Sequence, residues 1–187
     1  DLCFYVMVSA LVGARLLYVI VEYRYFLNDP LEVFKFWKGG LVFYGGLILG
    51  VLTSLWYLQR HQMPLWKTAD LLAPSIALGQ SIGRWGCLFA GCCYGKKTDA
   101  TWGVTFTDSR SLAPLEVSLH PAQIYLSLNA LFIFIFLMWL SKRKLFDGQI
   151  LWSYGILYSI GRFLIEYFRG DDRGFPIEQV FSTSQFV

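Results

Sequence analysis

The stretch PAQIYLSLNALFIFIFLMWL, residues 121–140, decides the fold class. It contains no charged residue, and it has the roughly 20 residues that a helix needs to cross a hydrocarbon core of about 30 Å. The whole chain is 56% hydrophobic and only 16% charged, whereas ordinary soluble domains carry about a quarter charged residues. The sequence therefore predicts an integral membrane protein.

Four more apolar runs of similar length lie on either side of this stretch, at 2–21, 41–58, 69 to about 93, and 148–168. We expect an all-α, polytopic transmembrane protein with five complete spans and part of a sixth, forming a single transmembrane domain over residues 1–187. Because the chain opens directly into one apolar run and stops near the start of another, we expect it to be a fragment. Within the long polar segment 94–119, residues 102–106 are expected to form a short strand or an interfacial piece.

Basic residues are concentrated in two short loops, and this predicts the orientation. Successive loops of a multi-pass chain alternate sides, so loops 59–68 and 141–147 lie on one side. Short loops rich in Lys and Arg stay cytoplasmic, which places the longer loops outside. The basic residues of the two loops are Arg60, Lys67, Lys142, Arg143 and Lys144.

Three arginines lie inside predicted spans: Arg15, Arg84 and Arg162. A charge at that depth costs at least about 2.5 kcal/mol on insertion scales, so each is a functional candidate. The alternative is a structural ion pair or a snorkelling side chain. Arg84 and Arg162 each follow a short basic loop by roughly fourteen residues, or about 20 Å of helix. Two arginines at one depth suggest a shared anion such as a lipid phosphate, which guanidinium binds bidentately.

The fifth run places four polar residues on one helical face. Tyr158, Arg162, Glu166 and Arg169 are spaced i, i+4, i+8 and i+11, so they are neighbours along the helix. We expect Glu166 to orient Arg162 or Arg169 rather than to act as an acid or base.

Glycines mark two further places. Gly45 and Gly46 open the second run, where small residues serve either close helix packing or the site. Pro74 is expected to break the third run. Around Arg84 the glycines are dense enough to predict an irregular backbone lining a cavity, which a membrane tolerates only when protein buries it; they are Gly83, Gly86, Gly91 and Gly95.

Other candidates are weaker. Cys87, Cys92 and Cys93 match no standard zinc spacing, so we expect no metal. His120 begins the fourth span, either as an interfacial polar residue or as part of the site. The net charge of +3 gives no reason to expect nucleic acid.

Four segments together resemble the prolipoprotein diacylglyceryl transferase family, essentially from end to end. GGLVFYGGLILG, residues 39–50, resembles the family's glycine-rich segment. GQSIGRWGCLFAGCCYGKKTDATWGVTF, residues 79–106, resembles the signature GR-x-G-N-x-x-x-G followed by W-G. LHPAQIY, residues 119–125, resembles HP-x-Q-x-Y-E, and YGILYSIGRFLIEYFRGDD, residues 154–172, resembles Y-x-x-x-R-x-x-x-E-x-x-R. No single motif is specific, but the four together are.

The resemblance implies a seven-helix protein, of which this chain lacks the first helix and most of the last, with an active site open outward and sideways to lipid. It implies transfer of diacylglyceryl from phosphatidylglycerol to the lipobox cysteine of a prolipoprotein signal peptide, at the outer face of the bacterial inner membrane. A thioether forms and glycerol phosphate leaves. The expected partners are phosphatidylglycerol, prolipoprotein signal peptides and membrane lipids, and no cofactor is needed.

We expect Arg84 and Arg162 to hold the phosphate and to stabilise the leaving group, since preorganised electrostatics is usually the largest catalytic contribution. His120 and Tyr44 are the candidate bases; histidine is the side chain whose unperturbed charge change falls near neutral pH. The other substrate-binding candidates are Tyr158, Glu166, Arg169, Gly45, Gly46, Gly95 and Arg15.

Three positions depart from the family pattern. Tyr44 replaces the usual His, Cys87 the usual Asn, and Leu126 the usual Glu. They leave a non-catalytic or differently specific lipid-binding paralogue as an alternative. A lipid or small-anion transporter also carries intramembrane charges and broken helices, but it typically has an internal repeat, and we find none.

Overall fold

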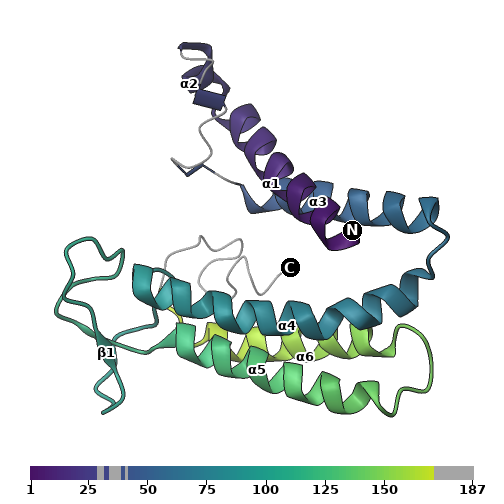
Figure 1. Ribbon diagram of the computed structural model, residues 1–187. Coiled ribbons are helices and arrows are strands. Elements are labelled where there is room, and N and C mark those ends of the chain that lie inside the picture. Colours follow the sequence, from purple (N-terminus) through teal and green to yellow (C-terminus); the bar gives the residue numbers. More distant parts are fainter. Residues whose placement is uncertain (29–31, 34–38, 41, 171–187) are drawn as a thin grey trace, which may run out of the picture. The chain divides into compact units, whose positions relative to one another are not determined.

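The computed structural model describes residues 1–28, 32–33, 39–40 and 42–170. Within this part the chain is mostly helical (Figure 1). The helices are α1 (Leu2–Val21), α2 (Tyr23–Asn28), α3 (Phe43–Arg60), α4 (Leu65–Ala90), α5 (Ala122–Ser141) and α6 (Gln149–Glu166), and two short strands are β1 (Val104–Thr105) and β2 (Ser118–Leu119).

The chain forms two compact units, Asp1–Leu65 and Trp66–Val187. In the first unit α1 crosses α3 where two glycines meet. A Cβ on Gly13 would collide with the carbonyl oxygen of Gly45, and a Cβ on Gly45 with that of Gly13. Small residues let two backbones approach this closely, as is common between membrane helices. The packing alternative for Gly45 is therefore realised.

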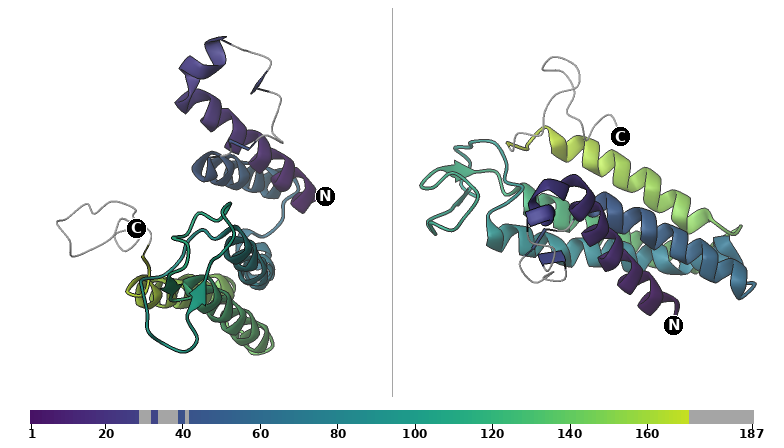
Figure 2. Two further views of the ribbon diagram at one scale, coloured as in Figure 1. Left: turned by 90° about the vertical axis from the view of Figure 1, so that its left-hand side faces the viewer. Right: turned by 90° about the horizontal axis from the view of Figure 1, so that it is seen from above.

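The second unit is a bundle of α4, α5 and α6, which lie side by side in all views (Figures 1 and 2). Loop 142–148 makes α5 and α6 antiparallel neighbours, whereas the longer segment 91–121 connects α4 to α5. Small side chains of α4 pack against branched side chains of the other two helices. The fully buried members of this core are Ala73, Ala77, Ile133, Leu137 and Ile150. Within this core α5 and α6 approach each other most closely, and α4 contributes the small residues Ala73 and Ala77.

The segments beyond the bundle join into a small β-structure. β1 pairs antiparallel with β2, Val104 opposite Leu119, as expected for residues 102–106. The chain at 94–98 lies between 118–120 and 168–170, because Gly95 N–H donates to the His120 carbonyl at 3.0 Å and Lys96 N–H to the Phe168 carbonyl at 2.8 Å. This structure ties the ends of all three helices of the bundle together.

The expectation of an irregular backbone around Arg84 is wrong. α4 runs unbroken from Leu65 to Ala90, with Pro74 inside it. A Cβ added at Gly83 or Gly86 would meet no atom within 4 Å, so these glycines lie on open helix faces and do not bend the chain. Of the four glycines around Arg84, Gly91 is the one with a positive φ, +66°, which favours glycine, and it ends the helix.

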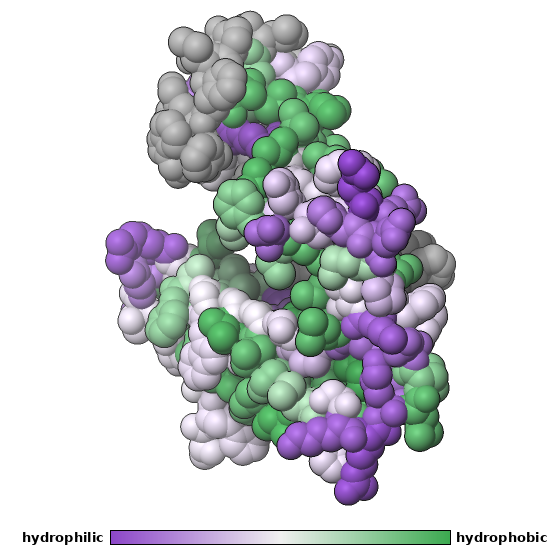
Figure 3. All heavy atoms as spheres, turned by 45° about the vertical axis from the view of Figure 1, so that its right-hand side comes forward, coloured by the Kyte–Doolittle hydropathy of each residue, from purple (hydrophilic) through white to green (hydrophobic). Residues whose placement is uncertain are grey.

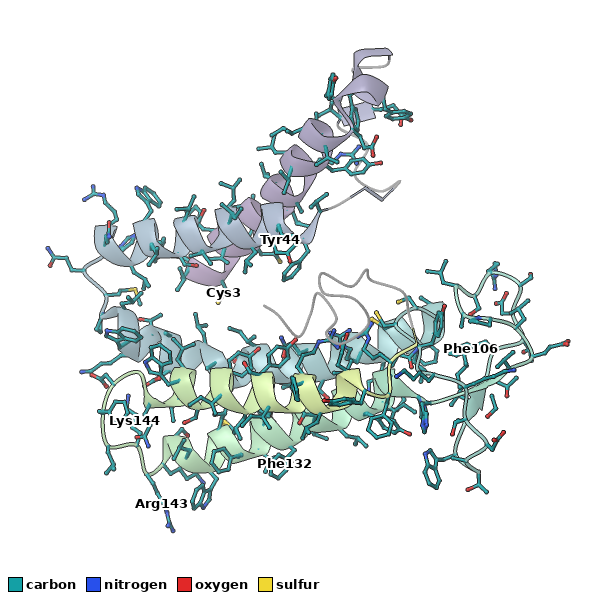
Figure 4. The ribbon with its side chains drawn as sticks, turned by 180° about the vertical axis from the view of Figure 1, so that it is seen from behind. Cys3, Tyr44, Phe106, Phe132, Arg143 and Lys144 are labelled. Carbon is teal, nitrogen blue, oxygen red and sulfur yellow. The ribbon has the colours of Figure 1, made fainter. Side chains whose placement is uncertain are left out.

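Two of the described helices, α1 and α5, are long and apolar enough to cross a membrane. Large apolar side chains are exposed along both helices and elsewhere, and Figure 3 shows them over much of one face. Phe132 of α5, 63% exposed, is one of them (Figure 4). Exposed apolar patches of this kind are unusual in soluble monomers, which agrees with a membrane protein. The expected part of a sixth span lies outside the described residues.

Candidate active site

A buried ion-pair cluster lies at the end of α6. Arg162 Nη2 is 2.8 Å from Glu166 Oε2, and Arg169 Nε is 3.9 Å from the same oxygen. The side chains are 12%, 7% and 3% exposed, in that order. One buried carboxylate therefore lies beside two buried guanidinium groups, the kind of side chain that forms paired hydrogen bonds with phosphate oxygens.

The part of α6 that precedes Glu166 packs against the rest of the bundle. Tyr158, one turn before Arg162, stacks on Tyr154 with ring centroids 5.8 Å apart and packs against the bundle core. A Cβ on Gly161 would collide with the Asn129 side chain of α5. Gly161 therefore lets a polar α5 side chain approach α6 directly beside Arg162.

Arg84 lies on α4, in the same unit as Arg162. Two contacts between helices allow the positions of Arg84 and Arg162 along the bundle axis to be compared. The Ser81 hydroxyl donates to the Ser127 carbonyl at 3.0 Å, and Gly161 meets Asn129, two residues further along α5. At 1.5 Å rise per residue these contacts put Arg84 and Arg162 within about one helical turn of each other. Arg84 is partly exposed.

Gly95 joins the ion-pair cluster to the start of α5. It is bridged to Arg169 on one side, and its N–H donates to the His120 carbonyl on the other. A Cβ at this position would lie 2.6 Å from the His120 Cβ and 2.7 Å from the Phe168 carbonyl oxygen. Glycine is thus required for close approach of these segments, and this makes Gly95 a positioning residue.

The His120 side chain lies in an aromatic group. Its Nδ1 is 3.2 Å from the Tyr125 hydroxyl, and its ring meets Phe168 edge-on at 5.3 Å. The Trp102 indole N–H donates to the same hydroxyl at 2.9 Å. The His120 carbonyl also accepts from Ala122 N–H at 2.8 Å, so a structural contribution to the start of α5 is present as well.

Sequence reasoning did not single out Tyr125 or Trp102. Both stand in quoted motifs, LHPAQIY and the W-G of residues 102–103. The available signal was the i, i+5 spacing of His120 and Tyr125 across a helix start, which brings the two side chains together. The Trp102 contact is long-range and left no local signal.

The remaining candidates belong to the first unit. Tyr44 projects from the start of α3 and is 62% exposed (Figure 4). A Cβ on Gly46 would lie 2.9 Å from the Ala10 carbonyl oxygen, so Gly46, like Gly45, is used in packing against α1.

Arg15 of α1 holds a loop. Its guanidinium donates to the backbone carbonyls of Glu32, Val33, Gly39 and Gly40, the last three at 2.8 to 3.1 Å. It also lies 5.4 Å from the Phe26 ring centroid. These bonds are to backbone carbonyls, so they differ from the ion pair and the snorkelling side chain considered above, and they give Arg15 a structural contact.

Two departures from the family pattern have structural counterparts. Leu126 is 4% exposed, so an apolar side chain fills its place at the interior of the bundle. The sulfur of Cys87 lies close to the sulfurs of Cys92 and Cys93.

The arrangement combines phosphate-binding and proton-transfer chemistry. Arg162 is oriented by a carboxylate, Arg84 lies at a similar height, and a histidine hydrogen-bonded to a tyrosine is tied to the same cluster through Gly95. Such a site suits an anionic lipid headgroup and a reaction that moves one proton.

Comparison with known proteins agrees with these observations. The family model described as prolipoprotein diacylglyceryl transferase matches residues 1–187. A phosphatidylglycerol–prolipoprotein diacylglyceryl transferase of Clostridium tetani is 39% identical over 180 residues, covering 96% of this chain and 71% of that protein. The second such enzyme of Clostridium perfringens is 38% identical, covering 96% and 69%. That of Synechococcus elongatus is 35% identical, covering 91% and 62%.

Proposed function

This chain belongs to the prolipoprotein diacylglyceryl transferase family, and we infer that it transfers a diacylglyceryl group from phosphatidylglycerol to a prolipoprotein. The acceptor we propose is the thiol of the lipobox cysteine in the signal peptide. The observation that supports the site assignment is the buried cluster in which Glu166 lies beside Arg162 and Arg169. Arg169 is also joined to Gly95 by a β-bridge.

The first step is binding of the phosphodiester. We assign its phosphate oxygens to the guanidinium of Arg162 on α6 and to that of Arg84 on α4. Arginine forms paired, charge-assisted hydrogen bonds with phosphate oxygens. Because Glu166 already holds Arg162 in a 2.8 Å ion pair, little reorganisation is needed when charge develops on the leaving group.

The second step is displacement at the glyceryl carbon. The cysteine thiol gives its proton to His120, and the thiolate sulfur forms the new C–S bond. The C–O bond to phosphate breaks, and glycerol phosphate leaves with that electron pair and its negative charge. If the His120 Nδ1–H donates to Tyr125, Nε2 keeps the lone pair that accepts the proton.

The membrane setting fits this reaction. We propose a multi-pass protein of the bacterial inner membrane, with loops 59–68 and 141–147 cytoplasmic. The ion-pair cluster and His120 lie at the opposite end of the bundle from loop 141–147. They would then face the outer leaflet, where a secreted lipoprotein precursor arrives.

Two alternatives have less support. A lipid or anion transporter would need the broken helices that α4 was expected to supply, and α4 is continuous. A non-catalytic paralogue is suggested by Tyr44, Cys87 and Leu126, and only an assay separates it from an enzyme.

The test is transfer of lipid to a lipobox peptide by the full-length protein in vesicles. We expect lipidation with phosphatidylglycerol and a cysteine-containing peptide. Phosphatidylethanolamine vesicles and a peptide with Cys→Ser at the lipobox are the matched controls, and neither should give product. Absence of product with the first pair would assign the chain to the non-catalytic branch.

A further inference from the structure

Three cysteines meet where α4 ends. Gly91, with φ +66°, reverses the chain after Ala90. Cys92 N–H then donates to the Cys87 carbonyl at 3.0 Å, and Gly91 N–H to the Leu88 carbonyl at 3.1 Å. These two bonds define a Schellman helix end, which folds the residue after the glycine back onto the last helical turn. The contact that is usually apolar at this place is here between two cysteines.

The third cysteine is placed by a second unusual backbone conformation. Cys93 has φ +59°, a region that residues with a Cβ rarely occupy outside functional sites. The preceding carbonyl, that of Cys92, is fixed by a 2.8 Å hydrogen bond from Gln123 Nε2 of α5. Gln62 and Glu116 have similar φ values, so the conformation alone indicates no function. The geometric observation is that the three sulfur atoms all lie within 4.8 Å of one another, with all three side chains partly buried.

We propose that Cys87, Cys92 and Cys93 form a metal site for a soft, thiophilic ion, Cu(I). Thiolate–metal bonds of about 2.3 Å place the sulfurs of a trigonal site about 4 Å apart, so small side-chain rotations close the observed group around an ion. Among the residues that the structure describes, the group consists of three thiols with no histidine or carboxylate, and such soft sulfur ligands select Cu(I). A structural zinc site takes four protein ligands.

The site has a defined structural consequence. Cys87 belongs to the last turn of α4, one turn after Arg84. Cys93 lies two residues before Gly95, which forms a β-bridge with Arg169. An ion bound by all three sulfurs therefore fastens the end of α4 to the β-structure. Binding displaces thiol protons, so the affinity rises with pH. The proposal does not depend on the transferase reaction.

The experiment is anaerobic titration of the purified, reduced full-length protein with Cu(I) against a chromogenic chelator. We expect one equivalent to bind per chain. Cys87→Ser, Cys92→Ser and Cys93→Ser should each weaken binding at least about 100-fold, since loss of even an outer-shell partner costs about 10–100-fold. Cys3→Ser is the matched control, because Cys3 is exposed in the first unit, and it should bind like the parent.

Three outcomes would overturn the proposal. The first is no Cu(I) binding by the parent in a preparation that unfolds cooperatively. The second is equal affinity of the parent and the three cluster variants. The third is a disulfide between two of the cysteines in protein isolated without reductant, with the third alkylated and no metal bound by mass spectrometry. Tighter binding of Zn(II) than of Cu(I), each measured with its own competitor, would reject the choice of ion.

Discussion

At the scale of single residues, Glu166 organises the candidate site. Its carboxylate lies 2.8 Å from Arg162 and 3.9 Å from Arg169, so one buried acid orients two guanidinium groups. A buried charge pair of this kind adds little stability compared with apolar packing. Its value is geometric, because it fixes a positive charge before the anionic substrate arrives.

The first prediction concerns that positive charge. Arg162→Ala should lower the rate of lipid transfer at least about 100-fold, the usual effect of removing one transition-state donor. Arg162→Lys should also fail, because an ammonium cannot reproduce the planar guanidinium fork. Arg84→Ala should lower the rate similarly. Initial rates with phosphatidylglycerol vesicles measure each effect.

The control for this prediction separates charge from folding. Arg162→Ala removes the counter-charge 2.8 Å from a buried Glu166, so it can destabilise the protein as well. The double variant Arg162→Ala/Glu166→Gln removes one charge of each sign, and a glutamine at position 166 keeps an oxygen that can accept a hydrogen bond from Arg169. We expect it to fold like the parent and to remain inactive, whereas recovered activity would remove Arg162 from the phosphate site.

The second prediction concerns His120. If it accepts the thiol proton, His120→Gln should slow transfer and abolish the acid limb of the pH–rate profile, because a general base acts only when deprotonated. Tyr125→Phe removes the group 3.2 Å from Nδ1 and should shift that limb without abolishing it. Tyr44→Phe completes the series, since Tyr44 is the other candidate base.

The outcomes of this series are distinct. If His120→Gln keeps both the rate and the acid limb, the residue only supports the start of α5 through its backbone. Loss of activity in Tyr44→Phe alone would then identify Tyr44 as the base, and full activity in both variants would favour proton loss assisted by the substrate.

At the scale of elements, α6 begins with a cap from another helix. Asp70 of α4, whose side chain is 4% exposed, accepts from Gly148 N–H at 2.8 Å and Leu151 N–H at 3.0 Å. Lys144 Nζ lies 3.4 Å away. Gly148, in the left-handed region at φ +97°, has no side chain to cap the helix itself. The carboxylate therefore satisfies orphan donors at the positive end of the α6 dipole.

The third prediction follows from this cap. Asp70→Ala should destabilise the protein by about 1–3 kcal/mol, the usual cost of buried donors left without an acceptor. Asp147→Ala is the matched control, since Asp147 also contacts Lys144 but is 42% exposed. It should change stability by less than about 1 kcal/mol. Chemical unfolding in detergent measures both, and equal effects would contradict the capping role.

Helices of this protein are predictable from sequence because an apolar run of spanning length is a local signal. The predicted spans end within about two residues of the observed helices, except α4, which starts earlier and ends earlier. Glycine density around Arg84 was misleading, because open space at Gly83 and Gly86 has the same sequence signature as an irregular backbone.

Contacts between distant segments were not predictable in the same way. Arg15 and Gly45 each had two interpretations, and only the partners decide between them: loop carbonyls for one and the Gly13 backbone for the other. The cysteine group depends on a helix end folding back at Gly91. Motif resemblance supplied the polar candidates for the site, but not the Trp102–Tyr125 hydrogen bond.

At the scale of the whole molecule, the start of α4 and the basic loop 141–147 lie at one end of the second unit. Trp66 stacks on Trp152 with centroids 6.4 Å apart, and Lys67 Nζ is 3.9 Å from Asp147. Arg143 and Lys144 lie on the loop between α5 and α6 (Figure 4). The start of α4 and loop 141–147 therefore belong to the same end of the bundle, away from the ion-pair cluster of α6.

The last prediction is that this end is cytoplasmic. Short loops rich in Lys and Arg are retained inside the cell, and the acceptor cysteine of a secreted precursor would then reach the opposite end. Single cysteines at exposed positions test this: His61→Cys and Lys142→Cys in the basic loops, Thr101→Cys and Ser109→Cys in the long loop. A membrane-impermeant maleimide applied to intact spheroplasts should label only positions 101 and 109 above the parent's background. All four should react once the membrane is permeabilised, which controls for accessibility. Labelling of 61 and 142 before permeabilisation, with 101 and 109 protected, would invert the orientation and place the ion-pair cluster on the side that secreted precursors leave.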